Sequence, residues 1–459
     1  MLDLGHTFLQ SVERSPGALA VVEGPVRLTY AQWNERVLRA AQGLADLGLR
    51  HGDHLVVMLQ NRWEMATLHW ACQFAGVIVT PLNWRAKADE VEYCLVDAEA
   101  RAIVYEPLGA DAVAAAPAAA RIARVALEEA PAGAMAFDAL LAAPPWSRGP
   151  TARPDDTSVM LYTSGTTGKP KGVPRSHRAE RAAALAHVAQ NAYLHGERTL
   201  GVMPLYHTMG VRSLLSIAMV DGVFACMPKF DAAAALAAIE AERLTCLYLV
   251  PTLYHDLIHH ADFAPARVAS VRKLGFAGAP MPDALLHKLR AAFSPELFVN
   301  HYGSSEVYTF TVSQDAVAKP GAAGKAGLNS RVRVVKLDAQ DPDDRAAPGV
   351  EGQIIADLQG DEAFSGYWKR PDADARSLRA GWYYTGDTGY LDEDGDLYVT
   401  GRVDDMIISG GENISPVEIE SILSLHPAVD EVAVVGLEDE RSEARRVGKK
   451  CKERWSPIH

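Results

Sequence analysis

The residues best suited to chemistry lie in a glycine-rich segment at 161–172. It reads Leu-Tyr-Thr-Ser-Gly-Thr-Thr-Gly-Lys-Pro-Lys-Gly and continues a short apolar run at 158–162. Backbone N–H groups, Ser and Thr hydroxyls and ammonium charge together suit the binding of a polyphosphate. The segment is not a Walker A loop, because only two residues separate Gly165 from Gly168 and a proline follows Lys169. Taken alone, such a loop can be no more than a turn.

Two carboxylates further along the chain could complete a nucleotide site. Glu306 ends the run Tyr-Gly-Ser-Ser-Glu after a strand-like segment at 297–299, and carboxylate oxygens are ligands that Mg²⁺ prefers. Asp387 ends the run Tyr-Thr-Gly-Asp and could accept hydrogen bonds from two ribose hydroxyls. Each has a simpler explanation when considered alone, Glu306 as an exposed acid and Asp387 as a turn residue.

Helical and strand patterns alternate along most of the chain, which is typical of an α/β architecture. Between 108 and 146 the chain is rich in Ala and Pro, and we expect a helical surface connection there. From about residue 352, short segments with turn signals indicate a small β region. Apolar spacing predicts helices over 30–47 and 62–75 and strands over 54–58, 77–80, 247–250 and 273–276.

Composition excludes several classes of protein. The 459 residues, 48% of them hydrophobic, suffice for two or three domains, and a net charge of −13 disfavours binding to nucleic acid. No apolar run reaches the roughly 20 residues needed to cross a bilayer, and the first residues do not resemble a signal peptide. The five cysteines are scattered, without a CxxC pair. We therefore expect a cytoplasmic protein without membrane contact; a homodimer is compatible with the sequence.

The segments together resemble the adenylate-forming superfamily, which contains acyl-CoA synthetases and other AMP-binding enzymes. The motifs agree with it in order and spacing from 163 to 420. The runs 203–207 (Met-Pro-Leu-Tyr-His) and 276–283 are most similar to those of benzoate and 4-chlorobenzoate CoA ligases. The resemblance implies an α/β fold with a large N-terminal domain, 1–402, built of two helix-flanked β-sheets and a small β-barrel-like part. A small α+β C-terminal domain would begin at 403 and be truncated near 440.

The resemblance also implies a reaction and its participants. A carboxylate attacks the α-phosphate of ATP to give an acyl adenylate, and CoA then displaces AMP, with Mg²⁺ as the metal ion. It assigns catalytic roles to Thr166, His207, Glu306 and Arg402, with Glu306 as the metal ligand. It assigns nucleotide binding to Thr163, Ser164, Gly165, Thr166, Thr167, Gly168, Lys171, Tyr302 (beside adenine), Gly303, Ser304, Ser305, Asp387 and Arg402.

The segment 401–420 combines a polar turn, a short apolar strand, a Gly-Gly pair and a helix start. By the resemblance, Asp404 is the hinge about which the C-terminal domain turns. Ser409, Gly410 and Gly411 would line the tunnel for the pantetheine arm of CoA, since residues with little or no side chain leave room for a thin thiol. Solvated turn acids and a plain hairpin are the simpler alternatives.

The acid is expected to be aromatic or heteroaromatic, of the benzoate or furoate type. Amino-acid-activating relatives carry Phe-Asp where this chain has Tyr206-His207, which disfavours an α-amino acid, although His207 could also be only a packing residue. A medium-chain fatty acid, a non-catalytic nucleotide- or acyl-binding remnant and a kinase-type phosphotransferase remain alternatives. The resemblance assigns the walls of the acyl pocket to His207, Met209, Leu249, Gly278, His301, Gly303 and Tyr308.

The last residues, 441–459, differ from the rest of the chain. They hold seven Lys or Arg and two Asp or Glu without apolar periodicity, and they resemble translated adapter sequence; a genuine basic tail is the alternative. The family places its catalytic lysine about ninety residues beyond the hinge. Lys449, Lys450 and Lys452 lie at the wrong distance, and we assign none of them this role.

We therefore predict that the 459-residue chain binds ATP and acid but adenylates slowly. Pyrophosphate release should be lower by a factor on the order of 100 than for a version carrying a complete C-terminal domain, because a cation that stabilises the transition state is missing. A coupled pyrophosphate assay measures both proteins. Equal turnover would contradict the prediction.

Overall fold

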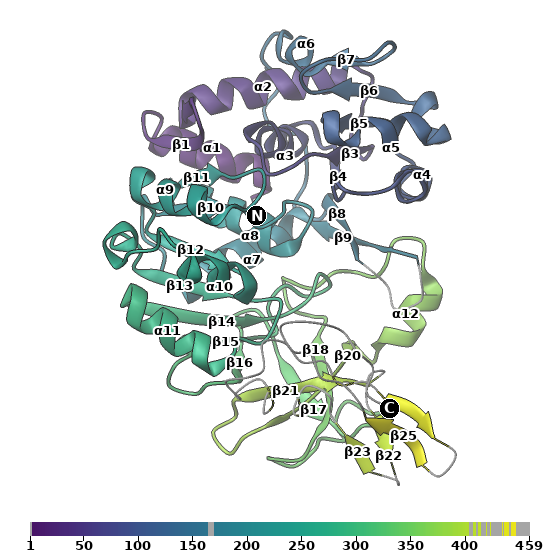
Figure 1. Ribbon diagram of the computed structural model, residues 1–459. Coiled ribbons are helices and arrows are strands. Elements are labelled where there is room, and N and C mark those ends of the chain that lie inside the picture. Colours follow the sequence, from purple (N-terminus) through teal and green to yellow (C-terminus); the bar gives the residue numbers. More distant parts are fainter. Residues whose placement is uncertain are drawn as a thin grey trace.

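The computed structural model describes residues 2–163 and 169–403. Beyond them it describes the backbone of 407–409, 412–414, 436–439 and 442–446 and the single positions 419, 423 and 434. Two large β-sheets dominate the described part, and Figure 1 follows the chain from the purple N-terminal helices to the yellow C-terminal strands.

The first sheet has seven strands in the order β7-β6-β5-β3-β4-β8-β9. All neighbours are parallel except β8 and β9, which form an antiparallel hairpin at one edge. The glycine-rich loop is the connection of this hairpin. The bounds are β3 His54–Met58, β4 Ile78–Pro81, β5 Ala102–Tyr105, β6 Ala123–Ala126, β7 Met135–Ala136, β8 Thr157–Thr163 and β9 Lys171–Ser176.

The second sheet has fourteen strands and two halves. In one half, β11, β10, β12, β13 and β14 run parallel, with β1 and β2 at the far edge. These strands are β1 Leu19–Glu23, β2 Val26–Thr29, β10 Arg198–Gly201, β11 Val223–Cys226, β12 Cys246–Leu249, β13 Lys273–Phe276 and β14 Leu297–Tyr302. The other half is antiparallel and forms the expected small β region: β15 Thr311–Ser313, β16 Ala322–Ala326, β17 Val332–Val335, β18 Gly352–Asp357, β19 Leu378–Arg379, β20 Trp382–Leu391 and β21 Leu397–Arg402.

Helices separate and cover the sheets. Helix α7 contacts β8 and β9 of the first sheet, and its His187 ring lies against rings of β12 and β14 in the second, so α7 lies between the two. None of the described helices is long and apolar enough to span a membrane. Their bounds are α1 Leu4–Arg14, α2 Tyr30–Asp46, α3 Trp63–Ala75, α4 Ala88–Asp97, α5 Ala110–Ala115, α6 Phe137–Leu141, α7 His177–Gln190, α8 Thr208–Met219, α9 Ala232–Glu242, α10 Pro251–His259, α11 Asp283–Phe293 and α12 Pro371–Ser377.

Most of the expected elements are present, with one clear correction. The predicted helices and strands correspond to α2, α3, β3, β4, β12 and β13 within about two residues. The prediction of a helical surface connection over 108–146 is only partly right: α5 and α6 are helical, but β6 and β7 in this stretch extend the first sheet beyond β5. Alanine disfavours strands only weakly, and pairing with a buried edge strand outweighs that preference. Near the C-terminus, β22 (Ile407–Ser409) pairs with β23 (Glu412–Ile414), and β24 (Gly436–Asp439) with β25 (Ser442–Arg446).

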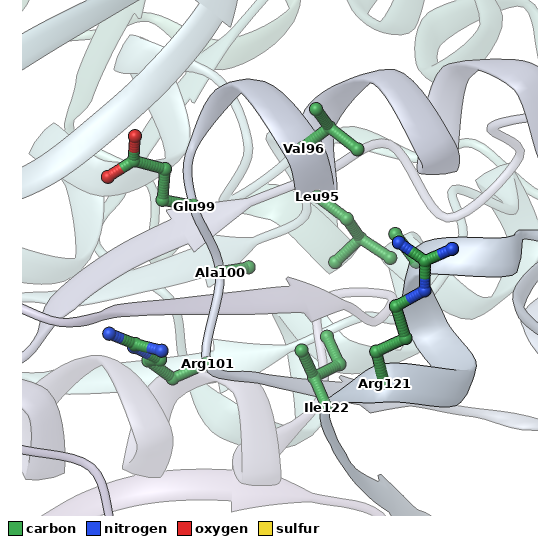
Figure 2. Close-up of a pocket in the computed structure, with 8 residues that line it drawn as sticks. Leu95, Val96, Glu99, Ala100, Arg101, Arg121 and Ile122 are labelled. Carbon is green, nitrogen blue, oxygen red and sulfur yellow. The ribbon is translucent and has the colours of Figure 1, made fainter.

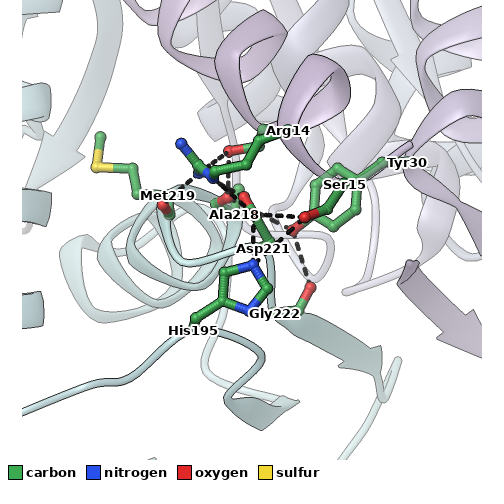
Figure 3. A network of polar contacts seen from close by, with 9 residues as sticks. Arg14, Ser15, Tyr30, His195, Ala218, Met219, Asp221 and Gly222 are labelled. Carbon is green, nitrogen blue, oxygen red and sulfur yellow. Dashed lines mark hydrogen bonds and ion pairs between the residues drawn. The ribbon is translucent and has the colours of Figure 1, made fainter. Parts of the chain in front are cut away.

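A buried carboxylate fastens α1 to the turn between α8 and β11 (Figure 3). Asp221 accepts hydrogen bonds from Arg14, at 2.7 Å from Nε and 2.5 Å from Nη2, from Ser15 Oγ at 2.7 Å, and from His195 Nε2 at 2.8 Å. The Tyr30 hydroxyl donates to the nearby carbonyl of Gly222 at 2.9 Å. Burial by itself would raise the pKa of Asp221, but the hydrogen bonds from Arg14 and Ser15 outweigh it and hold the pKa below its usual value.

We predict that Asp221→Asn lowers the free energy of unfolding at neutral pH by about 1–3 kcal/mol, since Asn fits the left-handed backbone but lacks the charge. A carboxyl whose folded pKa is depressed stabilises the protein above its unfolded pKa of about 3.9, so the difference should shrink as the pH falls through that region. Urea unfolding from pH 3 to 7 measures it. The matched control, Asp155→Asn, removes an exposed partner of Arg178 and should change stability by less than about 0.5 kcal/mol; equal effects would contradict the prediction.

Candidate active site

The β8–β9 hairpin presents the glycine-rich loop at the edge of the first sheet. Thr163 and Lys171 face each other where the two strands separate. The five residues between Thr163 and Lys169, which are Ser164, Gly165, Thr166, Thr167 and Gly168, lie outside the described residues. The structure thus fixes both ends of the predicted phosphate loop.

A tight turn at the end of β14 positions Glu306. The Ser304 hydroxyl accepts from the backbone N–H groups of Glu306 at 3.2 Å and Val307 at 3.4 Å. A Cβ on Gly303 would stand 2.0 Å from the backbone oxygen of Tyr308, so only glycine lets the chain pass here. The conformation of this turn, together with Ser305 within it, follows from local residue types.

The Glu306 carboxylate is buried and held by a tyrosine. Its Oε1 accepts from the Tyr367 hydroxyl at 2.6 Å. The Lys171 ammonium lies 4.2 Å from the centre of the Tyr367 ring. Within the described part of the chain, no hydrogen bond reaches Oε2 of Glu306, so this oxygen can accept a cation or a donor.

Asp387 forms a second acidic position beside the first. The Tyr302 hydroxyl donates to its Oδ2 at 2.5 Å, and Arg402 Nε lies 3.6 Å from Oδ1. Strand pairing sets the second contact, because Asp387 on β20 and Arg402 on β21 are register partners. The sequence predicts Tyr302, Asp387 and Arg402 separately as site residues. In the fold, Asp387 contacts both of the others.

The two acidic positions share one electrostatic environment. Burial raises the pKa of Asp387, hydrogen bonding from Tyr302 and the charge of Arg402 oppose that rise, and Glu306 adds to it. Burial lowers the pKa of Lys171, and the charge of Glu306 offsets part of the fall. The predicted metal ligand, ribose acceptor and phosphate lysine therefore lie within electrostatic reach of one another.

Arg175 connects the elements that carry these groups. It is fully buried on β9, four residues after Lys171, and its Nη1 donates to the backbone oxygens of Glu306 at 3.1 Å and Glu362 at 2.5 Å. Its Nε donates to the buried Glu180 carboxylate at 2.9 Å. One guanidinium thus joins the strand after the phosphate loop to the Glu306 turn.

The residues predicted to form the acyl pocket fall into two groups. At the carboxyl ends of the parallel strands, His207 caps α8 by accepting from Met209 N at 3.3 Å. A Cβ on Gly278, where φ is +85°, would lie 3.7 Å from Met209 Sδ and 3.4 Å from Val250, so these residues line one place. Leu249 is fully buried, and its side chain points to the opposite face of the sheet from that of Tyr248.

The second group lies deeper. His301 and Tyr308 are both at least 98% buried. His301 Nε2 contacts the side-chain amide of Asn191, and the Arg175 guanidinium stacks over the Tyr308 ring at 3.8 Å. Gly303 lies between these two residues in sequence and is itself exposed.

Other candidate places do not coincide with these residues. Asp404, Gly410 and Gly411 lie outside the described residues, and only the backbone of Ser409 is described, in β22.

A hollow of about 340 Å³ lies on α4 and the following segment. Leu95, Val96, Arg101, Arg121 and Ile122 are among the residues that line it, and none of the predicted site residues does (Figure 2). The acidic group Asp392, Asp394 and Asp396 converges on the ammonium of Lys319, at 2.6–2.9 Å, which occupies the point between the three carboxylates.

Comparison with known proteins identifies the family of the chain. The sequence profile of the AMP-binding enzyme family matches residues 8–368. The chain belongs to this family. In this AMP-binding enzyme, the matched range includes the β8–β9 hairpin, the Glu306 turn, Met209 and Gly278, whereas Asp387 and Arg402 lie beyond it.

Relatives of this AMP-binding enzyme include several CoA ligases. The chain is 35% identical to a feruloyl-CoA synthase of Amycolatopsis sp, over 95% of this chain and 86% of the relative. It is 33% identical to a long-chain-fatty-acid–CoA ligase of Mycobacterium tuberculosis (96% and 87%) and to a 4-chlorobenzoate–CoA ligase of Arthrobacter sp (94% and 82%). The resemblance therefore extends beyond the benzoate type.

A solved structure has the same fold. ATP-bound MatB of Rhodopseudomonas palustris superposes with a TM-score of 0.87 at 27% identity, over 97% of this chain and 88% of that one. The two-sheet α/β fold expected from the sequence is thereby confirmed. The roles of single residues rest on the geometry described above.

Sequence reasoning missed two side chains of the site in this AMP-binding enzyme. Tyr367 binds Glu306 from 61 residues away, and Arg175 reaches Glu306 across 131 residues. The only local signal for Tyr367 is the aromatic pair Tyr367-Trp368 after a glycine. Arg175 has no local signal beyond its place in the strand after the phosphate loop.

We predict that Arg175→Met lowers the free energy of unfolding by about 3–5 kcal/mol, because it leaves the Glu180 carboxylate buried without its partner. Urea unfolding measures the loss. The double variant Arg175→Met/Glu180→Gln removes both charges and should recover part of it. A single variant that loses less than about 1 kcal/mol would contradict the role of Arg175 as a structural tie.

Proposed function

We propose that this AMP-binding enzyme is an AMP-forming carboxylate–CoA ligase that activates an aromatic or heteroaromatic acid. The observation that supports it most directly is the convergence of Lys171, Glu306, Tyr302, Asp387 and Arg402 beside the ends of the glycine-rich loop. This set offers a cation and donors for phosphates together with acceptors for ribose and a metal ion. Such a mixed set suits a magnesium nucleotide.

The chemistry requires two anions to meet. The acid carboxylate attacks the α-phosphate of ATP, so repulsion and the charge that develops on phosphorus must both be offset. In our proposal the loop 163–168 and Lys171 hold the β- and γ-phosphates, and Ser304 and Ser305 lie near the α-phosphate. The Tyr367 ring holds the Lys171 ammonium over its face, and the Tyr367 hydroxyl donates to Glu306.

Mg²⁺ fits the residues at Glu306. The carboxylate is buried, one oxygen is fixed by Tyr367, and the other is available. When bound, the ion would neutralise phosphate charge as a Lewis acid. The contribution of the chain itself is to orient Glu306 through Tyr367 and through the hydrogen bond from Arg175 to its backbone oxygen.

The nucleoside end would be held at Asp387. Its carboxylate accepts the ribose hydroxyls, Arg402 supports it, and Tyr302 lies beside adenine while its hydroxyl orients Asp387. The acyl group would lie along Met209, Gly278 and His207 at the carboxyl ends of the parallel strands, the usual ligand position in α/β sheets. Asp404 as hinge and Ser409, Gly410 and Gly411 as the CoA tunnel complete the proposal.

A fatty acid is the second candidate for the acid. One relative is a long-chain-fatty-acid–CoA ligase at an identity equal to that of the 4-chlorobenzoate ligase. The deep acyl-side residues His301 and Tyr308 favour a ring with polar character instead, because an alkyl chain offers no hydrogen bond to buried polar groups.

The nucleotide product distinguishes a ligase from a kinase-type phosphotransferase. We predict that ATP, Mg²⁺ and the right acid yield AMP and pyrophosphate in equal amounts, and that AMP production rises when CoA is added. Chromatography of the nucleotides, with benzoate, 2-furoate, hydroxybenzoates and hexanoate as test acids, measures this. ADP as the product, or a tenfold preference for hexanoate over every ring acid, would contradict the proposal.

Binding tests the ribose position without requiring turnover. Asp387→Asn should weaken the binding of an acyl-sulfamoyl adenosine, measured by calorimetry, by about tenfold or more, since it removes a half-buried charged acceptor. Asp394→Asn, at an exposed carboxylate on the nearby turn, is the matched control and should leave affinity unchanged. Equal affinities for both variants and the unmodified chain would overturn the assignment of Asp387.

A further inference from the structure

Three aromatic side chains, which we call the buried ring cluster, pack together between α7 and the second sheet: His187, Tyr248 and His301. The His187 and His301 rings stack with centroids 5.0 Å apart, and Tyr248 meets them edge-on at 4.7 and 5.3 Å. Each residue is no more than 2% exposed. The cluster joins α7 to β12 and β14.

The cluster lies close to the carboxyl ends of its strands. Tyr248 is the next-to-last residue of β12, and His301 immediately precedes Tyr302, which donates to Asp387. Gly275 on β13 is the register partner of Tyr248, and a Cβ there would stand 3.0 Å from its ring and 3.3 Å from Asn191. Glycine at this position therefore leaves room for the Tyr248 ring and for Asn191.

Several polar atoms of the cluster have no hydrogen-bond partner. These are both ring nitrogens of His187, the Tyr248 hydroxyl and Nδ1 of His301. The Asn191 amide donates to the His187 backbone oxygen at 2.8 Å, and His301 Nε2 lies 3.0 Å from its Nδ2 and 3.2 Å from its Oδ1, so Nε2 is paired with this amide in either tautomer. His301 Nδ1 is a donor or an acceptor according to the tautomer. Leaving such groups buried without partners costs free energy, so a packing role alone explains them poorly.

The charge state of the cluster limits what it can bind. Burial, together with the nearby Arg212 cation, holds the pKa of His187 and of His301 well below the usual value; His301 also lowers the pKa of His187. Both rings are neutral at neutral pH. The Arg212 guanidinium already donates to Tyr308 O at 2.8 Å and Thr309 Oγ1 at 3.0 Å. The cluster therefore offers neutral donors and acceptors rather than a net charge.

We propose that the buried ring cluster forms the inner end of the acyl site and determines which acid binds there. We further propose that this acid carries a ring hydroxyl at the end remote from its carboxylate. A phenolic hydroxyl both donates and accepts, so it can pair with His301 Nδ1 in either tautomer and with the mixed capacity of His187 and Tyr248. A site built to hydrogen-bond a hydroxyl rejects the analogue that lacks it, because its buried polar groups stay unpaired. The inference rests on the proposed function, since it assumes that the acyl adenylate lies above this cluster.

Binding of stable adenylate mimics tests the inference on the chain as it is. Acyl-sulfamoyl adenosines carrying 2-, 3- or 4-hydroxybenzoyl or 4-hydroxycinnamoyl groups are compared by calorimetry with their unhydroxylated parents. At least one hydroxylated mimic should bind about tenfold or more tightly than its parent. Tyr248→Phe and His187→Phe should each reduce that ratio several-fold while leaving the affinity for the parent nearly unchanged.

Tyr254→Phe is the matched control. Tyr254 is as buried as Tyr248, but its hydroxyl donates to the backbone oxygens of Leu247 and Gly275, outside the cluster, so this variant should leave the ratio unchanged. No pair differing by more than about twofold, or an unchanged ratio in both cluster variants, would overturn the inference while the proposed function stands. Failure of every mimic to bind would overturn the proposed function and the inference with it.

Discussion

At the centre of this AMP-binding enzyme, several charged side chains must be held in fixed positions away from water. The fully buried Arg175 illustrates it: one guanidinium neutralises Glu180, donates to two backbone oxygens and stacks on Tyr308. A buried charge is tolerated only when it is paired and hydrogen-bonded. Arg175 is paired with Glu180 and hydrogen-bonded to backbone oxygens on other elements. Its position therefore ties the β8–β9 hairpin to the turn of Glu306.

The same reasoning distinguishes acidic groups that already have a cationic partner from those that do not. The three aspartates at 392, 394 and 396 point to one spot, but Lys319 already occupies it with its ammonium. Glu306 differs, because a neutral tyrosine holds one carboxylate oxygen and leaves its charge uncompensated at hydrogen-bond distance. An acid without a cation at hydrogen-bond distance is the better candidate for a metal ligand than a larger acidic group whose centre a lysine ammonium already occupies.

In the proposed ligase, the two halves of the second sheet carry different residues of the site. Its antiparallel half carries Asp387 and Arg402 as register partners. In its parallel half, β13 ends two residues before Gly278 and β14 ends at Tyr302. Helix α7 then closes the space between the sheets and places His187 over Tyr248 and His301. The nucleotide-side and acyl-side groups thus meet along a single sheet, at β14, where Tyr302 faces Asp387 and its neighbour His301 faces the rings.

The sequence by itself determined the family and the α/β alternation, and it predicted the main polar residues of the proposed site. Phosphate loops and tight turns are encoded by residues a few positions apart, as in the segment 161–172 and the Gly303–Glu306 turn, so their signals are readable along the chain. The tertiary structure alone decided which side chains hold those residues: Tyr367 on Glu306, Arg175 across 131 residues, and His187 against His301. It also made strands of β6 and β7 in an alanine-rich stretch. Such partners are chosen by packing between distant segments, and no local pattern of residue types records that choice.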